Sequence, residues 1–330
     1  MKLSILDQSP ISSGYSAKEA LEASAELAQT AEKLGFTRYW IAEHHHLSGF
    51  ASSAPEIMLS YIGAKTKKIR IGSGAILLPY YKPYKIAELF NMLAALFPGR
   101  VDLGIGRAPG GSAEASMALS DNFLEGVRQM PEKVKELLQF LNNDFPDNHM
   151  FAKISASPLP EIRPEPWLLG TSLKSALMAA ECGTAYVFGH FMSEKDGEDI
   201  IKQYRKNFIA RGTLQTPKVI LTVSAICAET TQKAEELALS SILWKIKAEN
   251  NEGTEGIPSI EEAKNHFSRL GMEPIINRKH DIIGSPKEVT EQLKDMKHRY
   301  QADEIMIVTL VHQYEDRLRS YELIAKELIK

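Results

Sequence analysis

Short, continuous apolar runs recur along the whole chain, and nearly every run is followed by a segment with helical periodicity. Strands that are apolar throughout are typical of parallel sheets covered on both faces. Eight such runs begin at about residues 3, 38, 70, 101, 166, 185, 219 and 304. The pattern predicts an α/β protein whose strands close into a (β/α)8 TIM barrel. An open doubly wound sheet is the alternative, because periodicity does not show closure.

The expected helices carry recognisable capping residues at their ends. We expect a helix over 17–34 that ends at Gly35, because glycine readily adopts the left-handed backbone that closes a helix. Another helix is expected to start after Ser285, with Pro286 in its first position and Glu288 completing a capping box. Both helices fall next to predicted strands, as a strand-helix repeat requires.

The chain of 330 residues is longer than a usual domain, yet barrels with insertions reach this length as one unit. We therefore expect a single barrel domain over 1–330. Residues 142–165 are rich in Asn, Asp and Pro and predict a long loop, which is the first candidate for a domain boundary. Residues 230–284 follow the seventh strand and predict a helical insertion. This insertion is either a lid over the carboxyl-terminal rim or a purely structural addition.

Charge and composition exclude several classes of protein. The net charge of −3 and the pI near 6.3 leave no basic surplus for a phosphate backbone, so we expect no nucleic-acid partner. The first residues show no signal-peptide pattern, and no apolar stretch is long enough to span a membrane. We expect a cytoplasmic protein that acts on a small molecule. Cys182 and Cys227 lie in apolar segments, which predicts buried structural thiols.

A dense polar cluster follows the second strand, where a barrel places its functional groups. It consists of Glu43, His44, His45 and His46. On an extended backbone His44 and His46 point to one side and His45 to the other. Since imidazole titrates near neutral pH, His44 is a candidate acid or base. The alternative is a polar cluster that only caps the strand, and no metal site is expected, because these neighbours do not supply a tetrahedral ligand set.

Small side chains mark the third strand. Ser73, Gly74 and Ala75 stand in a run otherwise filled by bulky residues. Small residues at an inner position let a planar ligand approach the backbone. The alternative is a crowded layer of the barrel that has room only for glycine and alanine.

Phosphate-binding residue types follow the fourth and fifth strands. Arg107 stands in GIGRAPGGS, and its guanidinium suits a phosphate, whereas Pro109 occupies the place of the third glycine of a dinucleotide-binding motif. Thr171, Ser172 and Ser175 begin the helix after the fifth strand, where free N–H groups attract anions. Plain N-capping of that helix is the alternative.

Four segments in this order resemble the bacterial luciferase-like monooxygenase family. They are WIAEHHH, GSGAILLP, FPGRVDLGIGR and GSPKEV. The resemblance implies a (β/α)8 barrel that binds reduced FMN, or a deazaflavin in some branches, at the strand carboxyl ends. By motif position, His44 is similar to the family's histidine beside the flavin ring. The pair Gly74 and Ala75 matches its non-proline cis peptide beneath the ring, and Arg107, Ser172 and Ser175 match its phosphate-binding positions.

The resemblance also implies the reaction. The family's chemistry suggests a two-component monooxygenase, most similar to its uncharacterised oxidoreductases, that uses loosely bound reduced FMN and O2 on a small organic substrate. A flavin reductase and a second copy of the chain are the implied partners. The alternatives are a non-oxygenating flavin-binding protein or NAD(P)H-flavin reductase, and a deazaflavin-dependent dehydrogenase. Residues 112–165 follow the family poorly, and Gly106 replaces the reactive cysteine of the light-emitting enzymes, so light emission is not expected.

Overall fold

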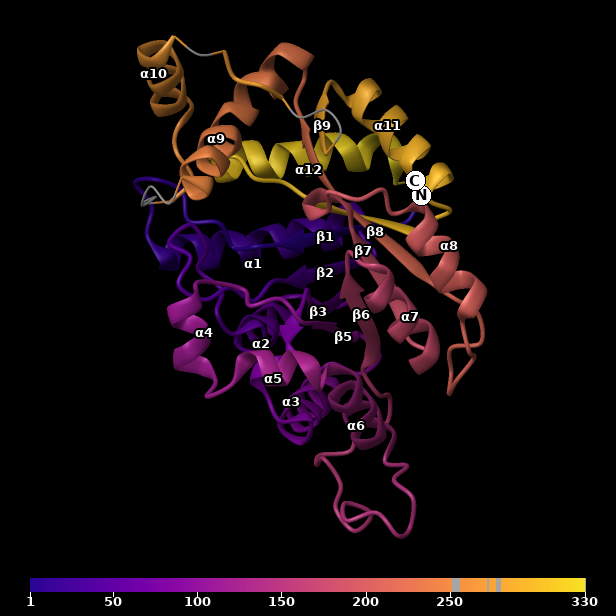
Figure 1. Cartoon of the computed structure of the whole chain (residues 1–330). Coiled ribbons are helices and arrows are strands. Elements are labelled where there is room, and N and C mark those ends of the chain that lie inside the picture. Colours follow the sequence, from indigo (N-terminus) through magenta and orange to yellow (C-terminus); the bar gives the residue numbers. More distant parts are fainter. Residues whose placement is uncertain (251–255, 272, 277–279, 330) are drawn as a thin grey trace.

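The computed structural model of the chain describes residues 1–250, 256–271, 273–276 and 280–329 (Figure 1). Within these residues, eight parallel strands close into a barrel. The closing strand pairs with both the seventh and the first, through Met306 opposite Thr222 and opposite Ser4. The strands are β1 (Leu3–Asp7), β2 (Arg38–Ile41), β3 (Arg70–Ser73), β5 (Val101–Gly106), β6 (Glu165–Gly170), β7 (Ala185–Gly189), β8 (Val219–Cys227) and β10 (Glu304–Val308). The predicted TIM barrel is confirmed, and the doubly wound alternative is wrong.

The third predicted strand is divided into two pieces. The strand β3 ends at Ser73, and a second piece, β4 (Ile76–Leu77), follows after the Gly74–Ala75 peptide bond, which is cis. Both pieces pair with β5. Gly104 on β5 lets them approach, since a Cβ there would lie 2.0 Å from the Ser73 carbonyl oxygen.

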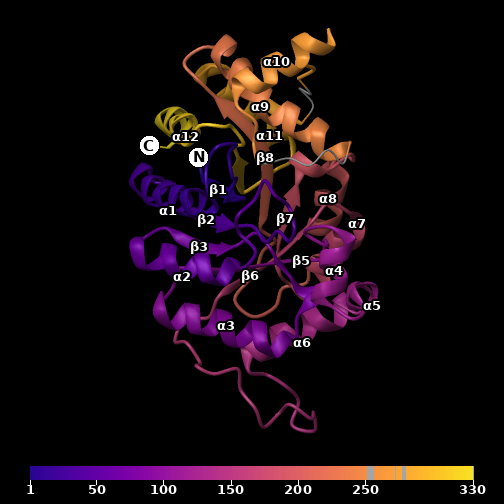
Figure 2. The same ribbon diagram turned by 90° about the vertical axis from the view of Figure 1, so that its left-hand side faces the viewer.

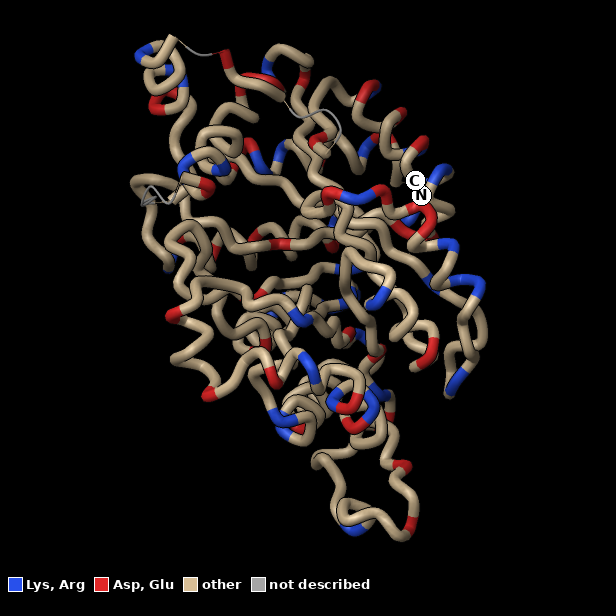
Figure 3. The backbone as a smooth tube through the Cα atoms, in the orientation of Figure 1, with Lys and Arg blue, Asp and Glu red and all other residues tan. Residues whose placement is uncertain are grey.

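Helices surround the strands on all sides (Figure 2). The helix α1 (Ala17–Leu34) has the expected bounds, and Gly35 closes it with a φ of 86°. The capping box of α11 (Pro286–Arg299) is confirmed, because the Ser285 N–H donates to the Glu288 carboxylate at 2.8 Å. The other surrounding helices are α2 (Pro55–Lys65), α3 (Pro83–Leu96), α6 (Met130–Asn142), α7 (Leu173–Cys182), α8 (Glu198–Asn207) and α12 (Tyr314–Leu328). Lys, Arg, Asp and Glu are interspersed along them (Figure 3).

The barrel interior is filled. Trp40 and Trp167 meet edge to face with their rings 5.7 Å apart and pack in one cluster with Leu6 and Met306. At the amino-terminal end of the strands, the buried Arg38 guanidinium bonds to Asp102 at 2.7 Å and to Glu304 at 2.8 Å. Because this ion network plugs that end, ligand chemistry is expected at the opposite, carboxyl-terminal end. Both cysteines are buried, as predicted.

Additional segments extend the basic repeat. Two short helices, α4 (Ala113–Leu119) and α5 (Phe123–Arg128), precede α6, and the turns η1 (Leu78–Tyr80) and η2 (His190–Met192) follow β4 and β7. The predicted long loop is confirmed over 143–164 and projects below the barrel (Figure 1). The insertion after the seventh barrel strand contains α9 (Thr231–Glu249), α10 (Ile260–Leu270) and β9 (Asp281–Gly284).

The insertion differs from the helical prediction in one respect. The strand β9 was not expected, because four residues with only two isoleucines among them, directly before a capping box, carry too little periodicity to be recognised. It pairs in parallel with the end of β8, through Ile282 opposite Ala225. The segment between α9 and α10 includes 251–255, which lie outside the described residues. Within the described part of the chain, no helix combines the length and apolar character that a membrane span needs.

Candidate functional site

The structure brings the predicted site segments to one end of the barrel. The segments 43–46, 73–75, Arg107 and 171–175 follow β2, β3, β5 and β6, and these strands are consecutive neighbours in the sheet. The strands are all parallel, so their carboxyl ends share one rim. The four segments therefore form one continuous arc, which we call the rim arc.

One end of the rim arc is suited to an anion. Ser172 is the N-cap of α7, and its hydroxyl accepts from the Ser175 N–H at 3.3 Å. Arg107 reaches the same hydroxyl, with Nη2 3.4 Å from Ser172 Oγ. The N-capping alternative is therefore confirmed for Ser172. Capping satisfies only part of the first turn, however, and the remaining N–H groups of α7 beside a guanidinium can bind a phosphate.

Ser175 lies deeper than Ser172. It is 2 % exposed, and its hydroxyl donates to the Ser172 carbonyl at 2.7 Å and lies 3.1 Å from the Tyr186 hydroxyl. Burial raises the pKa of Tyr186 to about 12, although the charge of Arg107 acts in the opposite direction. Tyr186 was not anticipated, because its position in the middle of an apolar run marks it as a core residue.

In the middle of the rim arc, the backbone at Gly74 lies in close contact with neighbouring residues of the barrel. Gly74 donates its N–H to the Ile41 carbonyl at 2.7 Å, and a Cβ at Gly74 would meet Leu6 at 2.4 Å. A Cβ at Gly106 would come within 3.0 Å of the Ala75 Cβ. Packing within the barrel therefore accounts for glycine at 74, which was the alternative explanation. At this point of the arc Gly74 is partly exposed and Ala75 is buried.

His44 occupies the other end of the rim arc. Its N–H donates to the Ser52 carbonyl at 2.9 Å, and its ring stacks on Phe50 with centroids 4.5 Å apart. Burial, together with the smaller effect of the neighbouring His45 charge, lowers the pKa of His44 to about 4. Nδ1 is buried and has no hydrogen-bond partner among the described residues. The ring is therefore neutral at pH 7.

The remaining residues of the polar cluster bind protein groups. His45 Nε2 lies 2.9 Å from a Glu43 carboxylate oxygen, and His46 Nδ1 lies 3.1 Å from the Ser112 hydroxyl. The expected side-to-side alternation assumed a continuing strand. The structure corrects this, because β2 ends at Ile41 and His46 has a φ of 51°, so the chain turns. The interactions of Glu43 were also missed, since two of its three partners, Leu77 and Tyr81, are distant in sequence.

The insertion lies against this end of the rim arc. Trp244 on α9 meets Phe50 edge to face with the rings 5.1 Å apart. Residues after β1 hold the segment before α10, since Ser13 N–H donates to the Ile257 carbonyl at 2.8 Å and Ile257 N–H donates to the Ile11 carbonyl at 2.7 Å. The insertion therefore reaches His44 through Phe50.

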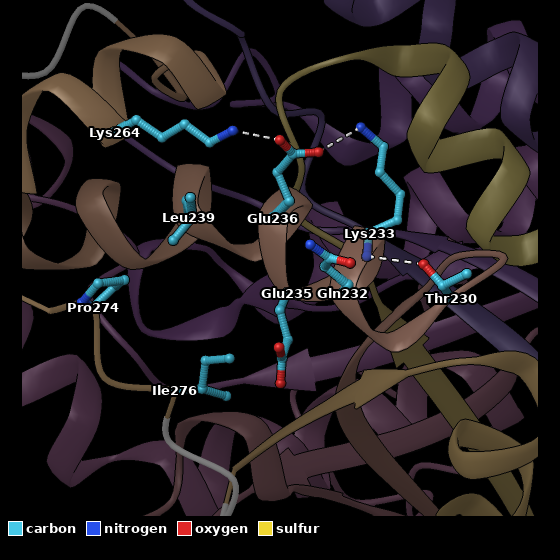
Figure 4. A pocket seen from close by; sticks show the side chains of 9 residues that line it. All are labelled: Thr230, Gln232, Lys233, Glu235, Glu236, Leu239, Lys264, Pro274 and Ile276. Atoms are coloured by element: carbon cyan, nitrogen blue, oxygen red, sulfur yellow. Dashed lines mark hydrogen bonds and ion pairs between the residues drawn. The ribbon is translucent and has the colours of Figure 1, made fainter.

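Hollows on the described part of the surface lie elsewhere. A pocket of about 530 Å³ is lined by α9, α10 and Pro274 and Ile276 (Figure 4). Lys233 and Lys264 both bond there to Glu236, so their charges are already partnered. A groove of about 1590 Å³ lies at the amino ends of the strands, beside Arg70. We place the candidate site at the rim arc, because it combines an arginine beside a helix N-terminus with an imidazole nitrogen that has no hydrogen-bond partner among the described residues.

Comparison with known proteins identifies the family. The family model described as luciferase-like monooxygenase matches residues 1–304, which is most of the chain. The chain belongs to the luciferase-like monooxygenase family. It is therefore an enzyme of this class, as the sequence motifs predicted.

Relatives of this luciferase-like monooxygenase match over their full length. It is 35% identical to the N-acetyl-S-alkylcysteine monooxygenase of Bacillus subtilis, over 100% of this chain and 98% of the relative. The crystal structure of apo-MsnO8 superposes with a TM-score of 0.89 at 34% identity, covering 98% of this chain and 97% of that one.

A more distant structure shares only the fold of this luciferase-like monooxygenase. It is the oxygenating constituent of 3,6-diketocamphane monooxygenase from the CAM plasmid of Pseudomonas putida, in complex with FMN. It superposes with a TM-score of 0.70 at 20% identity over 99% of this chain and 97% of that one.

Proposed function

We propose that this luciferase-like monooxygenase is an FMN-dependent oxygenase that binds the flavin along the rim arc. The observation that carries the proposal is the convergence of Arg107 and Ser172 at the start of α7, on the same rim as His44. Family membership supports the reaction class. Reduced FMN, when bound, would activate O2 so that one oxygen atom enters a small organic substrate.

The described residues fit FMN at both of its ends. The Arg107 guanidinium, the Ser172 hydroxyl and the free N–H groups of α7 would hold the phosphate, and Ser175 would keep Ser172 in place. The flat backbone at Gly74 and Ala75 would contact the ring. The two ends of the arc follow β2 and β6, with β3 and β5 between them, so a ligand bound along the whole arc would have to be elongated.

His44 is proposed as the group that handles a proton. Its ring is neutral at pH 7 and its Nδ1 is free of protein partners among the described residues. A neutral imidazole in a site from which water is excluded can accept a proton from the substrate or return one. The contact of Phe50 with Trp244 supports the insertion over 230–284 as a lid for this end, and that role stays a prediction.

Two partners belong to the proposal. A flavin reductase would deliver reduced FMN, and the structurally similar 3,6-diketocamphane monooxygenase chain, which is an oxygenating constituent, supports such a division of labour. A second copy of the chain would complete a homodimer. Exposed apolar side chains on two neighbouring helices support it, namely Ile57 on α2 at 68 % exposure and Leu96 on α3 at 61 %. We propose a cytoplasmic location for the complex.

Flavin titration of the Arg107→Ala variant tests the proposal. A hydrogen bond to a charged group contributes about 1.5 to 3 kcal/mol, so we expect the variant to bind FMN about tenfold to a hundredfold more weakly. Riboflavin lacks the phosphate, and its affinity should not change. Quenching of flavin fluorescence measures both, with Lys18→Ala on the exposed face of α1 as control.

Three outcomes would overturn the proposal. A wild-type protein that binds neither flavin excludes an FMN site. Tight binding of a deazaflavin alone would favour the dehydrogenase. Steady NADH oxidation by the purified protein alone would favour a self-sufficient flavin reductase instead of an oxygenase supplied with reduced FMN.

A further inference from the structure

A buried carboxylate lies behind the rim arc. Glu43 is 3 % exposed, and its two oxygens bind three groups. The Tyr81 hydroxyl donates at 2.7 Å, His45 Nε2 lies at 2.9 Å, and the Leu77 N–H donates at 3.0 Å. Burial raises the pKa of Glu43, and these three hydrogen bonds act against that rise. Burying a carboxylate costs free energy, and the three hydrogen bonds offset that cost. This arrangement indicates that the carboxylate holds the groups bonded to it in place.

The bond to Leu77 replaces a missing strand partner. Pairing between β2 and β3 ends with Ile41 opposite Ser73, so the neighbouring strand offers β4 no backbone acceptor on that side. The Glu43 side chain reaches across and accepts from the Leu77 N–H instead. The backbone between Gly74 and Leu77 is thus held from one side by β5 and from the other by this carboxylate.

The bond to His45 connects the same carboxylate to the loop after Arg107. The His45 N–H donates to the Gly110 carbonyl at 2.8 Å, and His45 forms an isolated parallel bridge with Gly111. A Cβ at Gly111 would lie 1.8 Å from the His45 carbonyl oxygen, so the two backbones are in close contact. Hydrogen bonds therefore connect the segment at 74–77 through Glu43 and His45 to the loop that carries Arg107.

We propose that Glu43 is a positioning residue that holds the ring-contacting backbone at 74–77 in register with the Arg107 loop. The inference rests on the proposed FMN site and deepens it. Glu43 does not touch the flavin in this arrangement and acts through Leu77 and His45. Its expected effect falls mainly on the ring, because the Leu77 bond is direct, whereas Arg107 stays bonded to Ser172 without it.

The test uses the isosteric variant Glu43→Gln. Glutamine keeps the shape but has only one acceptor oxygen. If that oxygen faces the Leu77 N–H, the Tyr81 hydroxyl and His45 Nε2 must both reverse and accept from the NH2 group, and if it faces them, the NH2 group meets the Leu77 N–H. We expect FMN and riboflavin to bind about tenfold more weakly, by the same factor, and the absorbance spectrum of bound FMN to change. This pattern differs from that of Arg107→Ala, which weakens FMN alone. Glu22→Gln on α1, an exposed member of a pair with Lys18, is the control.

A second variant covers the case in which Glu43→Gln does not fold. Tyr81→Phe keeps the ring and removes one donor, and it should weaken riboflavin and FMN equally, by about threefold. Unchanged riboflavin affinity and an unchanged flavin spectrum in folded Glu43→Gln, or in Tyr81→Phe, would overturn the positioning role while the FMN site stands. A wild-type protein that binds no flavin would instead overturn the proposed function, and this inference with it.

Discussion

His44 shows how burial adapts a common side chain to a task. In water an imidazole is half protonated near pH 6.5, but the folded chain lowers the pKa of His44 to about 4 through desolvation. The ring stacks on Phe50 and leaves Nδ1 without a partner among the described residues. A neutral nitrogen without a partner is suited to proton exchange. Because the pKa of His44 is lowered, however, the folded chain takes up a proton at this residue less readily than the unfolded chain does.

That difference predicts how stability depends on pH. Between pH 6.5 and about 4 the unfolded chain binds more protons at His44 than the folded chain does, so the free energy of unfolding falls as the pH falls through this window. Above pH 6.5 the contribution is constant. The loss reaches at most about 3 kcal/mol. Urea unfolding at about pH 4.5 and about pH 7.5 should show a smaller difference for His44→Gln than for wild type. Equal differences would contradict the buried, neutral state of His44.

The divided third strand depends on how closely it approaches β5. Gly104 has no side chain at the point where β3 ends, and the Ser73 hydroxyl donates to the Gly104 carbonyl at 2.8 Å. The Ser73 carbonyl oxygen occupies the space of a Cβ at 104. The close approach sets the path of the chain from Ser73 through Gly74 into β4, and this path provides the proposed ring-contacting backbone.

Replacing Gly104 with alanine should therefore destabilise the barrel strongly. Its Cβ would lie 2.0 Å from a backbone oxygen, which cannot move away as a flexible side chain can. We expect a loss of about 3 kcal/mol in the free energy of unfolding, near the upper end for overpacked cores. Gly212→Ala is the control: its φ is 53° and nothing lies within 4 Å, so only backbone strain of about 1 kcal/mol is expected. Chemical denaturation compares the two, and equal losses would argue against the crowded layer.

The outer surface of the barrel carries several strongly exposed apolar side chains on two of its helices. Its side chains lie on α2 and α3, which pack beside each other. They are Ile57, Tyr61, Met92 and Leu96, with exposed fractions of 68, 40, 49 and 61 %. Exposed apolar side chains on neighbouring helices are typical of interaction surfaces on soluble proteins. We therefore assign the proposed homodimer contact to this face.

The double variant Ile57→Asp with Leu96→Asp tests that assignment. Two carboxylates buried in a symmetric interface would each meet a copy of themselves or apolar surface, so the dimer should dissociate. Light scattering after size-exclusion chromatography should show a dimer for wild type and a monomer for the variant. Leu270→Asp, on the exposed end of α10, is the matched control and should stay dimeric. A monomeric wild type would refute the dimer itself.

Local patterns predicted much of this fold. Continuous apolar runs located the eight barrel strands, and capping residues such as Gly35 and Ser285 located helix ends, because both signals depend on neighbours within a few residues. The family motifs were also readable, and the positions after each strand pointed to His44, Arg107 and Ser172.

Long-range contacts supplied the rest. Closure needs β10 beside β1 at opposite ends of the chain, and the three partners of Glu43 include Leu77 and Tyr81, which are 34 and 38 positions away. The pKa of His44 depends on desolvation, which no motif encodes. Hydrogen bonds and burial between distant segments exist only after the chain has packed, so the order of elements and the capping residues follow from sequence alone, while the geometry of the rim arc follows from packing.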